Sequence, residues 1–205
     1  MKTITIIGGG TAGISIAARL LRENNNIQIN LFEPSEVHYY QPFYTLVGAG
    51  AEPKAKTTRP TKDVMPKGVN WIKRKIASFQ PENNAVICEQ GETHQYDYLI
   101  VAPGIQIDWH LIEGLKETLG KNGVGSIYGY NEAEENFNIL KNFKGGKAIF
   151  TAGHKPVKCG SASQKIMYLA ESYFQKHVIR KDTEVIFASA GTKSFGVPGF
   201  AEALQ

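Results

Sequence analysis

The chain has 205 residues, 42% of them hydrophobic and 20% charged, which is the composition of an ordinary globular protein with one large or two small domains. The formal net charge is only +4 and the longest basic cluster is Lys73–Lys75, so nucleic acid is not an expected partner. The two cysteines, Cys88 and Cys159, fit neither a zinc motif nor a disulfide framework, and we expect a reducing compartment.

The N-terminal segment, MKTITIIGGG, leads directly into a strand and a glycine turn. It lacks an apolar core followed by a small-residue cleavage site. No apolar run approaches the roughly 20 residues that cross a bilayer. We therefore expect a cytoplasmic protein, and a prokaryotic one, because no transit peptide precedes the first strand.

The N-terminal half alternates strands with a helix. TITII (residues 3–7) is a short apolar run next to glycines, which is typical of a buried parallel strand. A helix is predicted over residues 11–24 and a second strand over 27–34, so the chain begins with a β-α-β unit. Residues 35–60 are too long for a plain connector and indicate a functional segment. Residues 69–104 predict three strands separated by the turn signals PENN and GET, which form a β-meander.

A second α/β unit follows from Tyr130. Its predicted elements, in order, are a helix over 131–143, a strand over 147–152, a helix over 161–177 and a strand over 183–189. We expect two domains, residues 1–110 and residues 111–205. The second would be truncated, because the chain stops inside an apparent helix and partway through the unit.

The first turn carries a dinucleotide fingerprint. IIGGGTAGIS places Gly8, Gly10 and Gly13 in the order G-x-G-x-x-G, after a strand and at a helix start. Such glycines permit a tight turn, close approach of the backbone to a pyrophosphate, and packing of helix on strand. The N–H groups at the helix start then bind the anion. Glu33 ends the second strand, where a carboxylate accepts hydrogen bonds from ribose hydroxyls.

The cofactor is predicted to be FAD. YDYLIVAPG ends in Ala102, Pro103 and Gly104, which resembles the second fingerprint of two-domain flavoprotein reductases. The backbone of Ile76 lies where a strand would cross the adenine, although a core role for its side chain is an equal alternative. The predicted fold class is therefore α/β, a Rossmann-like FAD-binding domain with a β-meander plus part of a second Rossmann-like domain.

The turn after the strand at 147–152 differs from the first one. FTAGHKPVKCGSA places Gly153 and Gly160 too far apart for G-x-G-x-x-G, with Pro156 between them, which argues against a nicotinamide site. The turn offers Cys159 instead. A thiol near a helix N-terminus and beside Lys158 is expected to favour the reactive thiolate, the alternative being an inert buried cysteine.

Two further features concern the cysteines. Ser161 and Gln164 fit the S-x-x-Q pattern of a capping box and predict where the helix begins. Cys88 lies in AVICEQ, a strand of alternating character, and is interpreted as packing.

These residues carry a resemblance to a known family. EPSEVHYYQPFYTLVGAG, VAPGIQIDW and above all PVKCGSASQKIMYLAESYF resemble the sulfide:quinone oxidoreductases, over nearly the whole chain. The resemblance implies that sulfide is oxidised at a cysteine pair, that FAD passes electrons to a quinone, and that a small acceptor removes the sulfur. It also implies peripheral attachment to the inner face of the cell membrane through regions beyond Gln205. A homo-oligomer remains one option.

The resemblance also assigns residues. Cys159 matches one of the two redox cysteines, and the second one, like most of the quinone pocket, would follow Gln205. The cofactor positions it implies are Thr11 and Ala12 at the pyrophosphate turn, Glu33 at the ribose, and Gln41 and Pro42 beside the flavin.

Several other interpretations stay open. A type II NADH:quinone reductase, or another pyridine-nucleotide flavoprotein, would take electrons from NADH. A non-catalytic, redox-sensing FAD-binding fragment would not turn over at all. His38 and His154 could tune proton transfer or be structural, and the aromatic residues of YYQPFY could line the flavin or fill the core.

Overall fold

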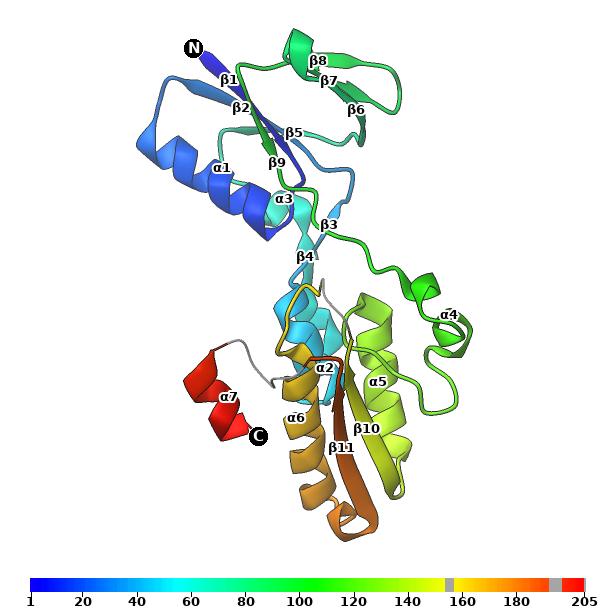
Figure 1. The fold of residues 1–205 in the computed structure, drawn as a ribbon. Coiled ribbons are helices and arrows are strands. Elements are labelled where there is room, and N and C mark those ends of the chain that lie inside the picture. Colours follow the sequence, from blue (N-terminus) through cyan, green and yellow to red (C-terminus); the bar gives the residue numbers. More distant parts are fainter. Residues whose placement is uncertain (154–156, 192–196, 205) are drawn as a thin grey trace. The chain divides into compact units, whose positions relative to one another are not determined.

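The computed structural model describes residues 1–153, 157–191 and 197–204 (Figure 1). The chain forms two compact units: unit 1 is Met1–Tyr40 with Thr58–Gln106, and unit 2 is Gln41–Thr57 with Ile107–Gln205. The segment at 41–57 therefore groups with the C-terminal half of the chain. The domain boundary expected near residue 110 stays a prediction.

Unit 1 is built on a parallel sheet. Its strands follow the order β5 (Val69–Ile72), β2 (Ile27–Phe32), β1 (Lys2–Ile7) and β9 (Tyr98–Val101). All three neighbouring pairs are parallel. Helix α1 (Thr11–Glu23) connects β1 to β2, as the β-α-β pattern predicted.

The alternation of side chains along β1 decides what covers each face of this sheet. Ile4 and Ile6 point to one face and pack with Ala17 of α1. Ile7 points to the other face, where it joins Phe32 in a separate apolar cluster. Because successive side chains of a strand alternate between faces, β1 has a buried core on both sides.

The second cluster is closed by the predicted β-meander. Strands β6 (Ile76–Gln80), β7 (Ala85–Cys88) and β8 (Thr93–Gln95) form an antiparallel sheet in that order. The prediction of three strands over residues 69–104 is wrong in number, since β5 and β9 are separate strands of the parallel sheet. The charged run Lys73–Lys75 follows β5. These three residues are exposed and belong to neither sheet, so they separate β5 from β6.

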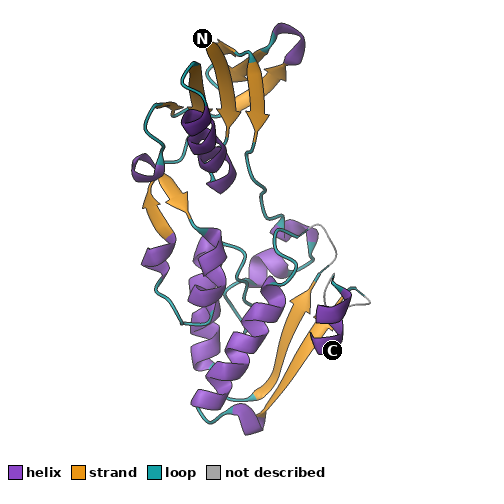
Figure 2. Cartoon of the chain, turned by 90° about the vertical axis from the view of Figure 1, so that its left-hand side faces the viewer, coloured by secondary structure: helices purple, strands orange, loops and turns teal. Residues whose placement is uncertain are grey.

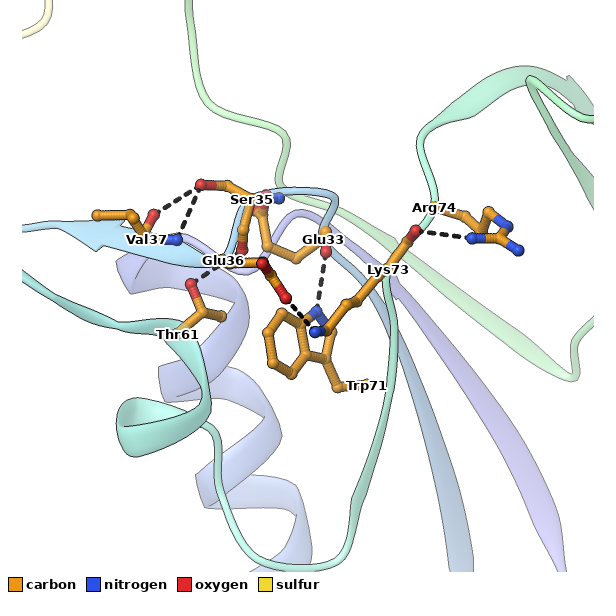
Figure 3. Close-up of polar contacts among 8 residues, drawn as sticks. All are labelled: Glu33, Ser35, Glu36, Val37, Thr61, Trp71, Lys73 and Arg74. Atoms are coloured by element: carbon orange, nitrogen blue, oxygen red, sulfur yellow. Dashed lines mark hydrogen bonds and ion pairs between the residues drawn. The ribbon is translucent and has the colours of Figure 1, made fainter.

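A small antiparallel pair completes unit 1. Strand β3 (Val37–Tyr39) pairs with β4 (Thr58–Pro60), and helix α3 (Thr61–Val64) follows. The Thr61 hydroxyl donates to the main-chain oxygen of Ser35 at 2.9 Å and ties α3 to the end of β2 (Figure 3).

Unit 2 pairs two parallel strands with helices. Strands β10 (Gly146–Ala152) and β11 (Thr183–Ser189) are joined through α6 (Ala162–Lys176). Helices α5 (Tyr130–Asn142) and α6 bury an apolar cluster against them, and Figure 2 shows the long helices on one side of the strands. Helix α2 (Tyr44–Gly48) packs on α5 through a second cluster.

Two further short helices of unit 2 are α4 (Leu115–Thr118) and α7 (Pro198–Leu204). Within the described ranges, no helix combines the length and the apolar character that crossing a membrane requires. The predicted α/β fold class, with a parallel sheet, a Rossmann-like first part and a β-meander, is confirmed.

Candidate functional site

The turn between β1 and α1 accepts only glycine at two positions. Gly8 has φ +99°, and a Cβ there would lie 2.2 Å from the main-chain oxygen of Ala102. A Cβ on Gly13 would lie 1.9 Å from the oxygen of Gly8. Contacts this short are impossible, so close packing of the turn against the helix and against the residue after β9 requires glycine at positions 8 and 13.

The start of α1 is open. Gly10 is the N-cap residue, no side chain caps the helix, and nothing lies within 4 Å of the place where its Cβ would be. Thr11 and Ala12 are exposed. The first N–H groups of α1 therefore face solvent at the positive end of the helix dipole, which is the arrangement that binds a phosphate.

The Glu33 carboxylate lies beside this turn. Its Oε2 accepts a hydrogen bond from the Gly9 N–H at 2.8 Å, and its Oε1 accepts one from the Ser35 N–H at 2.8 Å. Trp71 Nε1 donates to the main-chain oxygen of Glu33 at 2.8 Å and fixes the end of β2 (Figure 3). Each carboxylate oxygen keeps a second lone pair, so the side chain can also accept from a hydroxyl, as a ribose partner must.

Lys73 forms an ion pair with Glu36 next to this site, and its ammonium lies 4.7 Å from the Trp71 ring centroid. His38 Nδ1 lies 3.4 Å from the main-chain oxygen of Gly9. The structure therefore gives His38 a contact with the glycine turn through the backbone, which fits the structural reading of this residue.

Pairing of β1 with β9 brings the second predicted motif to the first one. The Ala102 N–H donates to the Ile7 oxygen at 2.8 Å. The Cα of Pro103 lies 2.9 Å from the place of a Gly8 Cβ. Gly104 has φ +79° with open space where its Cβ would be. The two motifs thus form one backbone-lined surface.

Ile76 differs from these residues. Its side chain is half-buried and packs against the cluster that contains Ile7 and Phe32. The side chain of Ile76 therefore has the core role that was the alternative to cofactor binding. Any contact with an adenine would be made by the backbone of Ile76.

Cys159 lies in the turn just before α6. It is partly buried and packs on Ala49, Ile127, Ala162 and Ile166. Burial raises the pKa of the thiol, but hydrogen bonds from Ser161 and the positive charge of Lys165 outweigh burial and leave the pKa lowered. The Ser161 hydroxyl is 3.7 Å from Sγ. The surroundings of the sulfur favour thiolate.

Two details of this turn contradict the sequence predictions. Lys158 is not among the groups that lower the pKa of Cys159, and its ammonium donates to Tyr128 O at 2.7 Å and to Gln41 Oε1 at 2.9 Å. The capping box is also wrong: the Ser161 side chain makes no cap hydrogen bond and lies beside the sulfur instead. The helix therefore begins at Ala162 without a side-chain cap.

Gln41 and Pro42 belong to a short 3₁₀ helix, Gln41–Phe43, and both are exposed. Through its bond to Lys158, Gln41 joins the cysteine turn within unit 2. The aromatic residue Tyr44 follows and is only 4% exposed, packed with Val47 and Ala133. It fills the core of unit 2.

Tyr128, Ser161 and Lys165 were not predicted to act on the thiol. The Tyr128 hydroxyl donates to the Cys159 main-chain oxygen at 3.0 Å. Nothing in the sequence near Tyr128 marks it, since it lies 31 positions before the cysteine. His154 and Pro156, which sequence analysis singled out, lie outside the described residues.

Cys88 is 1% exposed, and burial raises the pKa of its thiol. Ligand atoms of Cys88, Glu92 and His94 lie within 4.8 Å of one another. Arg74 lies 3.7 Å from the Glu92 carboxylate. A metal ion there would have to displace the thiol proton and compete with the guanidinium, so Cys88 is treated as packing.

Comparison with known families identifies the first part of the chain. The family model described as pyridine nucleotide-disulphide oxidoreductase matches residues 2–142. Sequence similarity extends further. The mitochondrial sulfide:quinone oxidoreductase of Dictyostelium discoideum is 44% identical over 204 residues, which is 98% of this chain and 45% of the relative.

The mitochondrial sulfide:quinone oxidoreductase of Mus musculus is 42% identical, again over 98% of this chain and 45% of the relative. The crystal structure of the sulfide:quinone oxidoreductase from Aquifex aeolicus superposes with a TM-score of 0.77 at 21% identity, covering 92% of this chain and 43% of that one. The predicted resemblance is confirmed. The chain spans about half the length of the curated relatives it matches.

Proposed function

Because the chain belongs to the pyridine nucleotide-disulphide oxidoreductase family, we propose that it is the FAD-binding and thiol-bearing part of a sulfide:quinone oxidoreductase. One observation carries the proposal. A cysteine whose pKa is lowered occupies the strand–helix turn where a second dinucleotide fingerprint would otherwise stand. Similarity to sulfide:quinone oxidoreductases over 98% of the chain supports it.

The cofactor of this family is FAD, and the residues of unit 1 fit it. The uncapped first turn of α1 at Gly10, Thr11 and Ala12 would hold the pyrophosphate. Glu33 would accept hydrogen bonds from the ribose through its remaining lone pairs. The close approach of Gly8 to Ala102 leaves a surface without side chains, on which a flat group could lie.

Further FAD contacts are proposed for the backbone of Ile76 and for Pro103 and Gly104, while the flavin role of Gln41 and Pro42 stays a prediction. Gly13 would act indirectly by letting α1 pack on the turn. When bound, FAD supplies a two-electron acceptor that can pass electrons to a quinone.

The chain's own chemistry centres on Cys159. We propose that it forms a disulfide with a second cysteine, which the family resemblance implies. Hydrosulfide attacks one sulfur of that bond, a new S–S bond forms, and the other cysteine leaves as a thiolate. The product is a cysteine persulfide, whose outer sulfur passes to a small acceptor nucleophile. Ser161 and Lys165 would stabilise Cys159 when it is the thiolate.

Location and partners follow from this chemistry. Quinones dissolve in bilayers, so we propose peripheral attachment to a membrane surface, on the inner face of the cell membrane. The names of the relatives place those proteins in mitochondria. If cell fractionation finds the protein in mitochondria, a mitochondrial membrane would take the place of the cell membrane as the proposed location.

The function is tested in the complete gene product that contains this chain. Sulfide should bleach the flavin absorbance, and a soluble quinone should restore it. Cys159→Ser should slow the bleaching by more than about a hundredfold, because a hydroxyl cannot take part in thiol–disulfide exchange. Cys88→Ala is the matched control and should bleach normally, since Cys88 is buried in packing contacts.

Two results would contradict the proposal. Near-normal bleaching of the Cys159→Ser protein by sulfide would remove the assigned nucleophile. Bleaching by NADH, with no response to sulfide, would identify a pyridine-nucleotide-linked reductase instead.

A further inference from the structure

We propose that Tyr128 is a positioning residue for Cys159, and that it sets the thiol's reactivity by gripping two consecutive residues of the cysteine turn. The biological role of this grip rests on the proposed function. The grip itself is a property of unit 2 and can be measured without FAD, sulfide or quinone.

The contacts come from both ends of the tyrosine. The Tyr128 hydroxyl donates to the main-chain oxygen of Cys159 at 3.0 Å. The main-chain oxygen of Tyr128 accepts from the Lys158 ammonium at 2.7 Å. The same tyrosine therefore accepts a hydrogen bond from residue 158 and donates one to residue 159.

Lys158 also connects Tyr128 to a third segment, the one that contains Gln41. Its ammonium also donates to Gln41 Oε1 at 2.9 Å. It lies 5.8 Å from the Tyr128 ring centroid and 5.9 Å from that of Tyr44. Lys158 is half-buried, and burial lowers its pKa. Its donors are thus aimed at a carbonyl and an amide oxygen rather than at the sulfur.

Position matters because the groups that favour thiolate lie at short range. Residues 157–161 form no regular structure, and α6 begins only at Ala162. The Cys159 oxygen accepts both the Tyr128 hydroxyl and the Ala162 N–H, the latter at 3.1 Å. These bonds fix the peptide that carries the thiol to the first turn of the helix. Without the hydroxyl, only the Ala162 N–H among the described residues holds the Cys159 oxygen, and the thiol can move away from the Ser161 hydroxyl and from Lys165.

The groups that act on the thiol come from two elements. Ser161 and Lys165, at the start of α6, lower its pKa, while burial raises it. Tyr128 comes from the segment before α5, and burial raises the pKa of its phenol, which therefore stays neutral near pH 7. Tyr128→Phe changes no charge at that pH. A change in the thiol's titration would then report altered position.

The test measures alkylation of Cys159 by iodoacetamide as a function of pH in the 205-residue chain, with peptide mass spectrometry to separate Cys159 from Cys88. Tyr128→Phe should move the midpoint of the profile upward. The rate of Cys159 alkylation at pH 7 should fall by roughly three- to tenfold in this variant. A rise of one pKa unit lowers the thiolate fraction about tenfold. Tyr168→Phe, on the exposed side of α6, is the matched control and should leave the profile unchanged.

Gln41→Leu provides a second variant that is also neutral. It removes one of two acceptors from Lys158 and should move the midpoint in the same direction by a smaller amount. This variant decides the question if Tyr128→Phe does not fold. An unchanged midpoint, or a fall in rate that is equal at every pH, would overturn the proposal. Failure of sulfide oxidation in the complete gene product would count against the proposed function alone.

Discussion

The turn between β1 and α1 and the turn between β10 and α6 both lead a parallel strand into a long helix, but different groups line them. In the first turn, Gly8 and Gly13 leave no room for side chains, and backbone N–H groups face outward. In the described part of the second turn, side chains form the contacts. The Lys158 ammonium donates to the Tyr128 main chain, and the Tyr128 hydroxyl donates to the Cys159 main chain. One turn is suited to a phosphate and the other to a reactive sulfur.

The two turns depend on distant residues in different ways. The glycine turn meets the Ala102 oxygen and the Glu33 carboxylate through its backbone, and Gly8 and Gly13 leave no room for a larger residue. The cysteine turn is defined by partners 30 and 117 positions away. The first should therefore be sensitive to small changes within the motif, and the second to changes elsewhere in the chain.

The largest effect is expected for Gly8→Ala. The new Cβ would meet the Ala102 oxygen at 2.2 Å, on a backbone with φ +99°. Strain of this kind should lower the free energy of unfolding of unit 1 by roughly 2–4 kcal/mol. Urea unfolding followed by Trp71 fluorescence, in a Trp109→Phe background, would report unit 1 alone, since Trp109 belongs to unit 2.

Gly10→Ala is the control for this experiment, because nothing lies within 4 Å of its Cβ position. Its stability should fall by no more than about 1 kcal/mol, the usual cost of alanine at an N-cap. Equal losses for Gly8→Ala and Gly10→Ala would show that the turn is not closely packed against β9.

The same contrast explains what sequence alone could predict. The glycine motif, the β-α-β unit and the position of Glu33 follow from short-range pattern, and the structure places them as that pattern requires. The split of residues 69–104 between two sheets did not follow, because strand pairing depends on partners far along the chain. The charged run Lys73–Lys75 was the available signal for that split.

The cysteine turn was predicted only in outline. A thiol before a helix could be read from FTAGHKPVKCGSA, but the partners of its neighbours could not. Adjacency in sequence suggested Lys158 as the cation that favours thiolate. The side chain instead points to Gln41 and Tyr128, since neighbouring residues in an extended turn project in different directions. Lys165 reaches the sulfur from the first turn of the helix.

Ser161→Ala should have a smaller effect, and one that separates the two roles considered for this serine. An ordinary N-cap serine contributes about 1 kcal/mol. Ser161 makes no cap bond, so the stability of unit 2 should fall by less than about 0.5 kcal/mol. The pKa of Cys159 should rise, because the hydroxyl near Sγ is lost.

The rate of Cys159 alkylation at pH 7 should therefore drop roughly three- to fivefold in the Ser161→Ala chain, by the linkage of pKa to thiolate fraction. Ser172→Ala, further along α6, is the control. A loss near 1 kcal/mol together with an unchanged alkylation profile would restore the capping role.

Lys165→Met should produce the smallest change. Its ammonium lowers the pKa of Cys159, so removing the charge raises the pKa and leaves less thiolate at pH 7. Lys165 is exposed, and solvent weakens its effect. We expect alkylation at pH 7 to slow by roughly two- to threefold at low salt, and by less at about 1 M salt, where the Debye length is about 3 Å.

Lys176→Met is the matched control for this last measurement, because it removes the same charge from the far end of α6, about 16 Å along the helix axis. Its alkylation profile should match the parent at every salt concentration. If both lysine variants slow the reaction equally, the thiol responds to the net charge of unit 2. A response confined to Lys165 would establish that the thiol responds to this lysine specifically, at the start of the same helix, and not to the net charge of unit 2.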